Sequence, residues 1–479
     1  MIRLFQAVTI YYFIIIKTLS GAIQHIDLQI MKTRLIIIMF IVIAVSAAFI
    51  TTLRLESEKP SIKIESMPDS IGASQEIILN ISDIKSGIRN IRIDLVQNGK
   101  ESPLYKKEFS ASNLTGSGYV LEESVKVIIE PEQAGLTDGK ALLRVAVADY
   151  SWHGWWHGNR AYLEKTIIID TRPPEIEILS RVHNITQGGA GLVIYRLLEP
   201  CIKSGVMAGD NFFPGQAGYS KDQTVFISFF ALDYKQGKGT KLFVQATDKA
   251  GNCAKAGFPY YIKARRFKQD IINISDSFLG WKMPEFEPDI PVADRSSMKD
   301  KFLNINNKLR KANFEKIAQV VKKTDKILYW KGAFLRLPKS ATRAGFADRR
   351  SYKYNGEIID HQIHLGIDLA SVAHSPVPAA NKGRVAFTGS IGIYGKTVII
   401  DHGFYLFSMY SHLSSIAVQK DQILLKGEIL GRTGTTGLAG GDHLHFSILV
   451  NNVFVNPLEW WDKAWIKNNI SSKLGLIQK

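Results

Sequence analysis

Cysteine is almost absent from this 479-residue chain, which contains only Cys201 and Cys253. Neither their spacing nor their position is typical of a metal site built from thiolates. Both fall in the same predicted β-structured region, so an oxidising compartment would allow them to pair as a disulfide. Two free, buried thiols are the alternative, and the sequence leaves both open.

Acidic residues are outnumbered as well, with 44 Asp and Glu against 60 Lys and Arg and a formal net charge of +16. The basic excess is spread along the chain and no nucleic-acid motif is present, so we expect no nucleic-acid partner. Such a charge favours contact with anionic surfaces, including cell-wall polymers and membranes. The hydrophobic content of 46% and charged content of 22% indicate a globular protein, and the length indicates several domains.

Residues 1–58 are predicted to form an N-terminal extension and a transmembrane helix, with the span at about 35–53. The span is close to the roughly 20 residues that cross a bilayer. Lys32 and Arg34 precede it, which places the N-terminus inside and the bulk of the chain outside. A cleaved signal peptide, cut near residues 45–47, is the alternative; the apolar run continues past that point and favours a retained anchor. We interpret residues 1–30 as an upstream extension whose translation is an open question.

From residue 60 to about 275 the sequence alternates short β-prone runs with turns, which indicates antiparallel sandwiches. Residues 144–149 resemble residues 243–248, and residues 246–252 resemble a loop common in bacterial immunoglobulin-like domains. We therefore predict two tandem immunoglobulin-like modules, at 60–172 and 173–283.

An aromatic cluster at residues 152–157 (Trp-His-Gly-Trp-Trp-His) lies in a loop of the first module. It is either a surface on which sugars or peptides stack or a plug that packs on the sandwich. Aromatic rings supply a large area for burial in both cases. We favour the plug.

Residues 284–328 are predicted to be a linker and a helical spacer. Residues 284–291 are rich in proline and acidic residues, which is typical of a linker. A helix is predicted over about 297–324, because apolar residues recur there at helical spacing: Phe302, Ile305, Leu309 and Phe314. A separate domain is predicted at 329–465, followed by a basic tail at 466–479 that can form a short amphipathic helix.

Histidine is concentrated in that last domain, because seven of the chain's 11 histidines lie between residues 361 and 445. His443 and His445 are two positions apart in a β-prone stretch, so both imidazoles point to one face of a strand. His364 and Asp368 are four positions apart around a predicted turn, where they can wrap a metal ion. His412 follows an apolar run, on or beside another strand. Zinc binds histidine nitrogen and carboxylate oxygen, and a catalytic zinc site uses three protein ligands.

Taken together, these segments resemble the catalytic domain of the lysostaphin-type zinc endopeptidases, which cut the peptide part of peptidoglycan. The resemblance covers residues 346–446 and includes His364-Leu-Gly-Ile-Asp368, Pro376-Val-Pro-Ala-Ala380, Thr433-Gly-Thr-Thr-Gly437 and His443-Leu-His-Phe446. The chain departs from the family pattern at Asp442, where proline is frequent, and at Ser447, where glutamate is frequent.

The resemblance implies one Zn²⁺ held by His364, Asp368 and His445. It implies that His443 acts as general base or orients the water, and that His412 contacts the water or stabilises the oxyanion. His361, His374 and His402 are interpreted as ordinary surface or supporting residues. The fold class we predict is multidomain and mostly β, with one N-terminal transmembrane helix and a C-terminal antiparallel β catalytic domain.

The expected function is that of a zinc metalloendopeptidase that hydrolyses peptide cross-links between the stem peptides of peptidoglycan. We expect a single-pass protein of a bacterial inner membrane whose catalytic domain lies in the periplasm. The alternative is an inactive or masked family member that regulates other cell-wall hydrolases through an unknown partner.

Overall fold

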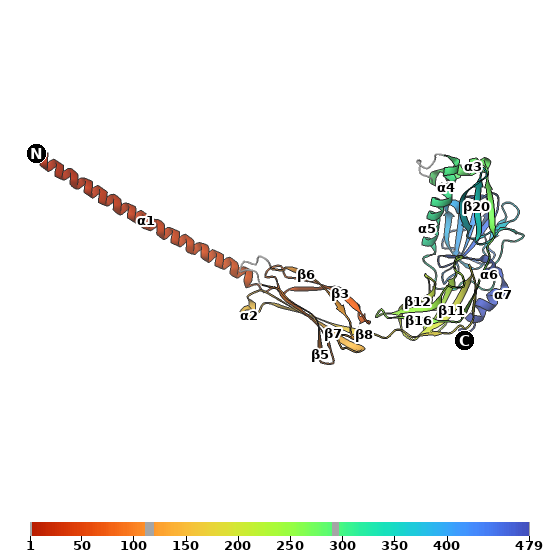
Figure 1. Ribbon diagram of the computed structural model, residues 1–479, viewed down its shortest axis with the longest axis horizontal. Helices are drawn as coiled ribbons and strands as arrows, with labels where there is room; N and C mark the ends of the chain where they lie inside the picture. Colours follow the sequence, from red (N-terminus) through yellow and green to blue (C-terminus); the bar gives the residue numbers. More distant parts are fainter. Residues whose placement is uncertain (1, 111–118, 290–296, 479) are drawn as a thin grey trace. The chain divides into compact units, whose positions relative to one another are not determined.

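The computed structural model describes residues 2–110, 119–289 and 297–478. The chain divides into two compact units, Met1–Thr171 and Arg172–Lys479. Each unit is described by itself below. The predicted mostly-β architecture with one apolar N-terminal helix is confirmed (Figure 1).

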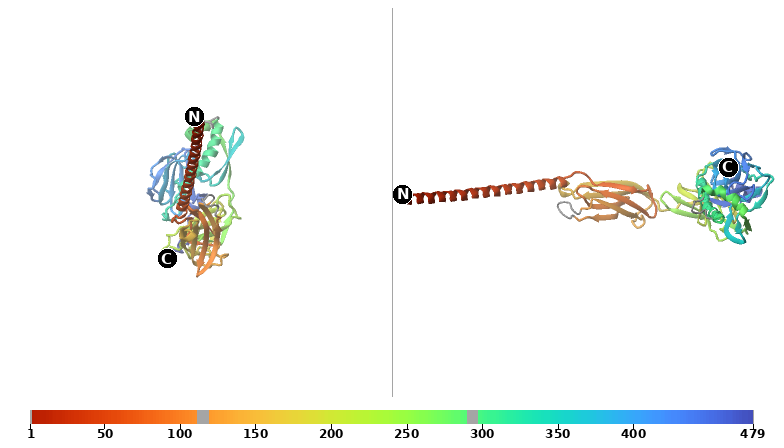
Figure 2. Two further views of the ribbon diagram at one scale, coloured as in Figure 1. Left: turned by 90° about the vertical axis from the view of Figure 1, so that its left-hand side faces the viewer. Right: turned by 90° about the horizontal axis from the view of Figure 1, so that it is seen from above.

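The first unit begins with α1 (Ile2–Arg54), one unbroken helix of 53 residues (Figure 2). Its segment Gln29–Thr52 is, within the described part of the chain, the one stretch long and apolar enough to cross a membrane. The apolar side chains from 35 to 43 are all exposed. A helix that is apolar all round is stable in a surrounding that is itself apolar, such as lipid.

Residues 61–169, here called the N-terminal sandwich, form two sheets over one core. Their strands pair antiparallel except for one short parallel pair at an edge. Alternation along the strands builds this core; Ile77, Leu79 and Ile81 point inward from β3 and each is at most 1% exposed. One sheet has the order β1 (Ser61–Ser66), β3 (Gln75–Ser82), β6 (Glu122–Ile129). The other has the order β2 (Ser70–Ile71), β8 (Arg160–Ile169), β7 (Gly139–Asp149), β4 (Ile88–Gln97), β5 (Lys100–Glu108).

The second unit opens with a β-region at residues 176–263. Its larger sheets have the orders β14 (Val225–Ala231), β11 (Ala190–Leu197), β9 (Ile176–Ile178), and β13 (Asn211–Pro214), β12 (Cys201–Ala208), β15 (Leu242–Asp248), β16 (Cys253–Gly257). A two-stranded parallel sheet pairs β10 (His183–Thr186) with β17 (Tyr260–Lys263). This region shares one hydrophobic core with the C-terminal residues, and Phe229 packs against both Trp330 and Trp460.

The two cysteines are free in this region. Cys201 lies on β12 and Cys253 on β16, and β15 runs between these strands. Strands two places apart are separated by about 9–10 Å, beyond the roughly 7 Å limit between Cα atoms of a disulfide. The pairing alternative does not fit this register, and Cys253 is exposed where a buried thiol was expected.

Helices connect this region to the C-terminal domain: α3 (Asp276–Lys282), the 3₁₀ helix η1 (Met283–Asp289), α4 (Met298–Asn304), the π-helical η3 (Ile305–Leu309) and α5 (Arg310–Val321). The predicted helix is present and buries Phe302 and Ile305 against the C-terminal domain. The first half of the predicted linker is helical instead of open, because Phe286 is 1% exposed and joins the same core. Residues 290–296 of the predicted linker and spacer lie outside the described residues.

The C-terminal domain is built on a ten-stranded sheet that includes β19 (Ala341–Ala344), β22 (Ile367–Ala370), β23 (Pro376–Pro378), β24 (Gly383–Ser390), β25 (Lys396–Asp401), β26 (Leu406–Ile416), β27 (Ile423–Leu424), β28 (Ile429–Thr433), β29 (Leu444–Val450) and β30 (Val453–Val455). A second sheet has the order β18 (Gln269–Ile274), β20 (Asp348–Tyr354), β21 (Glu357–His364). The two sheets meet where β21 ends and β22 begins.

The chain ends in α6 (Pro457–Trp461), α7 (Lys463–Ile466), the π-helical η5 (Lys467–Ser471) and α8 (Ser472–Leu474). The predicted amphipathic character of this tail is seen in the burial of Ile466 and Ile470 in the core shared with the β-region. The Lys473 ammonium donates to the Leu192 carbonyl on β11 at 2.9 Å. The tail is thus packed on the β-region rather than free.

Candidate active site

Three of the predicted site residues converge to a single point. His364 Nε2 lies 2.9 Å from Asp368 Oδ1 and 3.0 Å from His445 Nδ1, and His445 Nδ1 lies 2.9 Å from the same carboxylate oxygen. All three side chains are buried, with exposures of 5%, 8% and 4%. They form one of two groups in the described chain whose side chains could share a metal ion.

The strand order explains this convergence. His364 is the last residue of β21, and Asp368 pairs directly with His445 across β22 and β29. Residue 366 lies in the turn between His364 and Asp368, and a Cβ there would come within 2.5 Å of the His445 ring and 2.7 Å of Ser447 Oγ. Only glycine fits this position, so Gly366 allows the two strands to bring their ligands together.

Hydrogen bonds on the outer side fix the tautomers of both histidines. His364 Nδ1 donates to the Gly345 carbonyl at 2.8 Å, which leaves Nε2 facing inward. His445 Nε2 donates to Ser447 Oγ at 3.0 Å, and that hydroxyl donates in turn to the Leu365 carbonyl at 2.8 Å. Both inward nitrogens therefore present lone pairs to the carboxylate. Ser447, which departs from the family pattern, is the residue that orients His445.

This donor set fits a zinc ion. Three acceptor atoms within 3.0 Å of one another repel each other unless a cation or shared protons lie among them. In a tetrahedral site with bonds of about 2.0–2.1 Å, ligand atoms are about 3.3 Å apart, close to the spacing seen here. Outer hydrogen bonds of the kind made by Gly345 and Ser447 are those that accompany metal-binding histidines.

His412 and His443 lie beside the three converging residues. Their ring centroids are 4.8 Å apart, and His443 Nε2 is 3.5 Å from Asp368 Oδ1. The Nδ1 of His412 donates to the Thr436 carbonyl at 2.8 Å, and the Nδ1 of His443 donates to the Gly441 carbonyl at 2.8 Å. Each therefore presents Nε2 to the space next to the cluster.

His412 is held there by a backbone irregularity. Its φ is +61° within β26, and the register of β26 against β25 slips at this point, so that β26 carries one extra residue. A bulge of this kind redirects a side chain, and positive φ is costly for a residue with a Cβ. The strained backbone conformation thus occurs at the residue whose imidazole must face the cluster.

The surroundings shift the pKa values of His412 and His443 in opposite directions. Burial lowers the pKa of His412 well below its ordinary value. Burial also acts downward on His443, but the hydrogen bond and charge of Asp368 outweigh it, and the pKa of His443 is raised. For Asp368, burial acts upward and is outweighed by the neighbouring imidazoles, that of His364 most of all, so its pKa lies well below the ordinary value.

Arg350 is a site residue that we did not predict. Its guanidinium donates to Asp368 Oδ2 at 2.8 Å, on the oxygen that faces away from the histidines. Arg350 lies within residues 346–352, which resemble the family, and this resemblance could have identified it as a candidate site residue. The ion pair fixes the rotation of the Asp368 carboxylate, because Oδ1 and Oδ2 each have a separate partner.

A cavity of about 390 Å³ opens beside these residues and is lined by Arg350, Asp368, His412, His443 and His445. Its other wall comes from segments that precede residue 329 in the chain: Ile272 and Ile274 of β18, Phe278 of α3 and Phe302 of α4. Lys282 and Glu285 fasten this wall, since Lys282 contacts the Thr435 carbonyl and Glu285 accepts from the Gly437 amide at 2.5 Å. The helical spacer is therefore part of the site.

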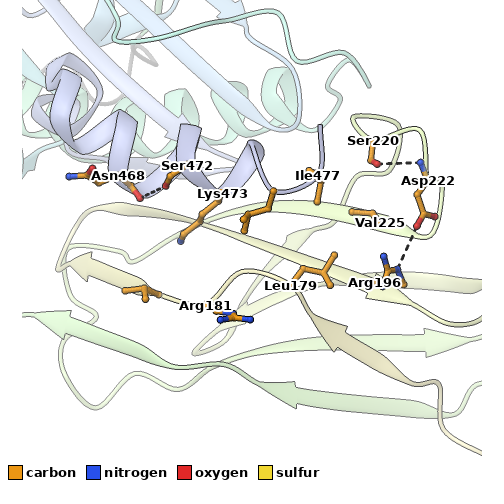
Figure 3. Close-up of a pocket in the computed structure, with 12 residues that line it drawn as sticks. Leu179, Arg181, Arg196, Ser220, Asp222, Val225, Asn468, Ser472, Lys473 and Ile477 are labelled. Atoms are coloured by element: carbon orange, nitrogen blue, oxygen red, sulfur yellow. Dashed lines mark hydrogen bonds and ion pairs between the residues drawn. The ribbon is translucent and has the colours of Figure 1, made fainter. Parts of the chain in front are cut away.

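A larger hollow, of about 720 Å³, lies between the β-region and the C-terminal helices (Figure 3). Its lining includes Arg181, Arg196, Asp222 and Lys473, and the last extends from the helical tail toward the strands. It contains no histidine and only one carboxylate among its lining residues. The chemistry of metal binding and proton transfer is therefore found at the smaller cavity.

The remaining predicted histidines stay apart from the cluster. His361 bonds to Ser351 Oγ, and His374 is exposed beside Asp442. His402 is fully buried and bonds to the Lys382 carbonyl and to Ser408 Oγ. Burial lowers the pKa of His402 to about 4, so it is neutral at physiological pH.

Comparison with known sequences places residues 362–457 in the sequence profile of peptidase family M23. Among curated relatives, "DD-carboxypeptidase/endopeptidase Mpg" of Neisseria meningitidis is 34% identical over 133 residues, which are 28% of this chain and 30% of that protein. "Peptidoglycan DD-endopeptidase ShyA" of Vibrio cholerae is 32% identical over 130 residues, which are 26% of this chain and 30% of that protein. The chain thus matches about a third of the length of these relatives.

Comparison with solved structures gives two further likenesses. The catalytic domain of lysostaphin from Staphylococcus simulans covers 27% of this chain and 98% of its own, at 23% identity and a TM-score of 0.24. A zinc-containing peptidase from Vibrio cholerae covers 85% of this chain and 88% of its own, at 15% identity and a TM-score of 0.23.

Proposed function

The C-terminal part of this chain carries a peptidase family M23 domain, and from that premise we propose that the protein is a membrane-anchored zinc metalloendopeptidase acting on peptide cross-links in peptidoglycan. The observation that carries the proposal is the convergence of His364, Asp368 and His445 within 3.0 Å, with two further imidazoles alongside. We propose peptidoglycan as the substrate because relatives that share this segment are named as peptidoglycan DD-endopeptidases.

His364, Asp368 and His445 would hold the zinc ion. When bound, zinc lowers the pKa of a coordinated water toward about 7 and polarises a carbonyl oxygen. Arg350 and Ser447 keep the Asp368 carboxylate and the His445 ring in the orientation that binding needs. Gly345 does the same for His364 through its carbonyl.

His443 is assigned the proton transfer. Its Nδ1 is committed to the Gly441 carbonyl, so Nε2 is the atom that accepts a proton from the attacking water and returns it to the leaving amine. His443 Nε2 lies 3.5 Å from Asp368 Oδ1, beside the three residues that would hold the metal. His412 remains neutral because its pKa is lowered, and its Nε2 accepts a hydrogen bond from the water and orients it.

The placement we propose is a bacterial inner membrane, crossed once by the segment Gln29–Thr52, with the catalytic domain on the periplasmic side. Lys32 and Arg34 lie at the start of this segment, which favours a cytoplasmic N-terminus. The substrate would then be the stem peptides of the periplasmic wall.

A regulatory function is the second candidate, because β18, α3 and α4 form one wall of the site cavity. A segment in that position either shapes a groove for the peptide or restricts access to it. The complete set of metal-binding and proton-transfer residues favours the enzyme over an inactive regulator.

The test is the release of uncross-linked muropeptides from purified peptidoglycan by the full chain in detergent, followed by liquid chromatography and mass spectrometry. We expect new uncross-linked muropeptides that disappear with a zinc chelator, return with added zinc, and are absent for Asp368→Ala. No release by zinc-loaded protein would contradict the proposal. Stimulation of another wall hydrolase in its place would establish the regulatory candidate.

A further inference from the structure

Apolar side chains are exposed at the end of the N-terminal sandwich that receives α1. Trp155 is 90% exposed and Trp156 is 61% exposed, which shows that the predicted plug is wrong for both. Ile84 and Leu121, on two neighbouring loops, are 73% and 44% exposed. Exposed apolar residues gathered on one surface, rather than scattered, indicate a partner.

Hydrogen bonds connect these loops to the last turn of α1 and to the residues that follow it. The Trp152 amide bonds to the Arg54 carbonyl, at 2.6 Å, and Ser86 Oγ donates to Glu56 Oε1 at 2.9 Å. Asn159 donates to the Glu58 carbonyl at 2.9 Å. Arg54 itself is 4% exposed. The position of the tryptophan loop relative to the end of α1 is therefore fixed by the fold.

This connection sets the depth of the tryptophan loop. The membrane-crossing segment ends at Thr52, and Arg54 is two residues further, or about 3 Å along a helix. The headgroup layer on each side of the hydrocarbon is roughly 5–8 Å thick. A loop bonded to the Arg54 carbonyl therefore lies at the level of the lipid headgroups when this segment spans a bilayer.

The side chains suit that layer. Tryptophan is enriched at membrane interfaces because its ring is apolar while its N–H can donate. The acidic groups at this end, Glu56, Asp83 and Asp149, are at most 7% exposed and do not face outward. Glu58, whose side chain is 60% exposed at this end, is paired with Lys85 at 2.7 Å. The outward surface thus carries aromatic and aliphatic groups beside this ion pair.

A basic pocket adjoins the tryptophans. Arg89 donates to the Trp156 carbonyl at 3.2 Å, and together with Arg160, His157 and Arg92 it lines a hollow of about 370 Å³. Arg92 is paired with Asp94 and Glu101. Arg89 and Arg160 form no ion pair with a described residue, although the charge of Arg89 contributes to the lowered pKa of Glu108. Their remaining N–H groups can bind an anion.

We propose that this end of the N-terminal sandwich is a lipid-binding surface. Trp155 and Trp156 insert into the headgroup layer, and the pocket of Arg89, Arg160 and His157 binds the phosphate of a phospholipid. The inference rests on the membrane anchor in the proposed function. Its consequence is that the sandwich is held against the bilayer and does not swing freely on α1.

Tryptophan fluorescence can report contact of the sandwich with lipid, because none of the eight tryptophans lies in residues 1–58 and the membrane helix gives no tryptophan signal of its own. The full chain is reconstituted into vesicles of phosphatidylcholine and phosphatidylglycerol, some with acyl chains brominated near the headgroup and others near the chain end. We expect tryptophan fluorescence to be quenched most by bromine near the headgroup. Trp155→Phe with Trp156→Phe abolishes this quenching, whereas Trp281→Phe, an exposed tryptophan of the other unit, preserves it. Unchanged quenching in the double variant, or none in the wild type, contradicts the proposal.

The pocket is tested by Arg89→Ala with Arg160→Ala in the same vesicles. We expect headgroup-level quenching to lose its dependence on the fraction of phosphatidylglycerol, while Lys63→Ala, an exposed cation on β1, leaves the dependence intact. If the arginine variant loses binding of inorganic phosphate but keeps the lipid dependence, the pocket binds free phosphate and the lipid assignment is wrong.

Carbonate extraction of membranes separates this inference from the proposed function. Recovery of the chain in the soluble fraction shows that α1 is no anchor, and it overturns the lipid-binding surface. Chelator-sensitive muropeptide release in detergent tests the peptidase independently of either result.

Discussion

The described residues contain two buried three-residue clusters whose side chains lie close enough together to share a metal ion, and the two differ in composition and in what surrounds them. His364, Asp368 and His445 form one, and Glu56, Asp83 and Asp149 form the other. In the first, the inward atoms of two imidazoles and one carboxylate meet within 3.0 Å and open on a cavity. The second lies at the end of the N-terminal sandwich next to α1.

The acidic cluster is satisfied by the protein itself. Asp83 Oδ1 accepts the amides of Ser86 and Gly87 at 2.9 and 2.7 Å. Asp149 Oδ1 accepts the Asn159 amide at 2.7 Å, and the Asn159 side chain donates to Asp149 Oδ2 at 2.9 Å. Burial and proximity are therefore insufficient to define a metal site. The two clusters differ in what their inward atoms contact. In the acidic cluster, carboxylate oxygens accept hydrogen bonds from the protein. In the histidine cluster, the metal-binding atoms face one another, and the protein's hydrogen bonds are made by the outer nitrogens of the two rings.

The largest effect is expected from removing a donor of the histidine cluster. His364→Ala should lose both zinc and muropeptide release, because two ligands do not hold a catalytic zinc ion. Metal content and cleavage are measured on one preparation. Glu56→Gln, which changes the other cluster, is the matched control and should keep both. Normal cleavage by His364→Ala would contradict the assignment of the histidine cluster, rather than the acidic one, as the metal centre.

A large loss of rate without loss of metal is expected at the neighbouring imidazoles. His443→Ala should retain zinc and lower kcat by roughly 10²–10⁴-fold, since it removes the residue that transfers the proton. His412→Ala should also retain zinc and lose rate. Loss of zinc from His443→Ala would identify His443 as a ligand instead.

A smaller effect is expected from the hydroxyl that orients His445. Ser447→Ala leaves His445 Nε2 without its acceptor and should weaken zinc affinity about 10–100-fold, as outer hydrogen-bond partners of metal ligands typically do. Competition with a chromophoric chelator measures the affinity. Ser447→Thr keeps a hydroxyl and should restore most of it; equal affinities for all three proteins would show that Ser447 does not support the site.

The acidic cluster should respond in stability alone. Asn159→Ala removes a 5% exposed side chain that bonds to Asp149 and to the Glu58 carbonyl. Leaving those groups buried without a donor should destabilise the first unit by about 1–3 kcal/mol. Limited proteolysis reports the loss, while zinc content and cleavage stay unchanged. A loss of zinc in this variant would show that the two clusters are coupled.

A pH-dependent effect is expected at Glu459 on α6, whose carboxylate accepts the Ala190 amide on β11 at 2.9 Å. Burial raises the pKa of Glu459 from 4.5 to about 7. The stability it contributes is full below pH 4.5 and is lost as the pH rises through 7. Glu459→Gln should therefore gain up to about 3 kcal/mol relative to wild type at pH 8 and little at pH 4. Thermal unfolding at both values measures the difference, and a gain independent of pH would exclude the carboxylate as its source.

The sequence was sufficient for residues whose partners are near in the chain or share a recognisable spacing. His364 and Asp368 are four apart, and His443 and His445 are two apart, so local geometry already brought each pair together. Arg350 was missed because its contact with Asp368 depends on the pairing of separate strands. The cavity wall was missed for the same reason, since Phe302 was interpreted only as part of a helical stripe and its role depends on where that helix packs.

The tryptophan loop shows a different limit. Aromatic residues are equally suited to a core and to an interface, so composition at residues 152–157 favoured the more common plug. The loop is placed at the end of α1 by tertiary hydrogen bonds, such as those of Trp152 to Arg54 and of Asn159 to Glu58, which the sequence does not reveal. The domain boundaries and the immunoglobulin-like character of the two β-regions stay predictions.

The most direct measurement is zinc stoichiometry at equilibrium for four purified proteins: wild type, His364→Ala, Asp368→Ala and His443→Ala. We expect about one zinc ion per chain for wild type and for His443→Ala, and none for the other two, because three donors bind and the adjacent imidazole does not. Zinc retained by His364→Ala or Asp368→Ala, or none in folded wild type, would contradict the assignment of this cluster as the metal centre.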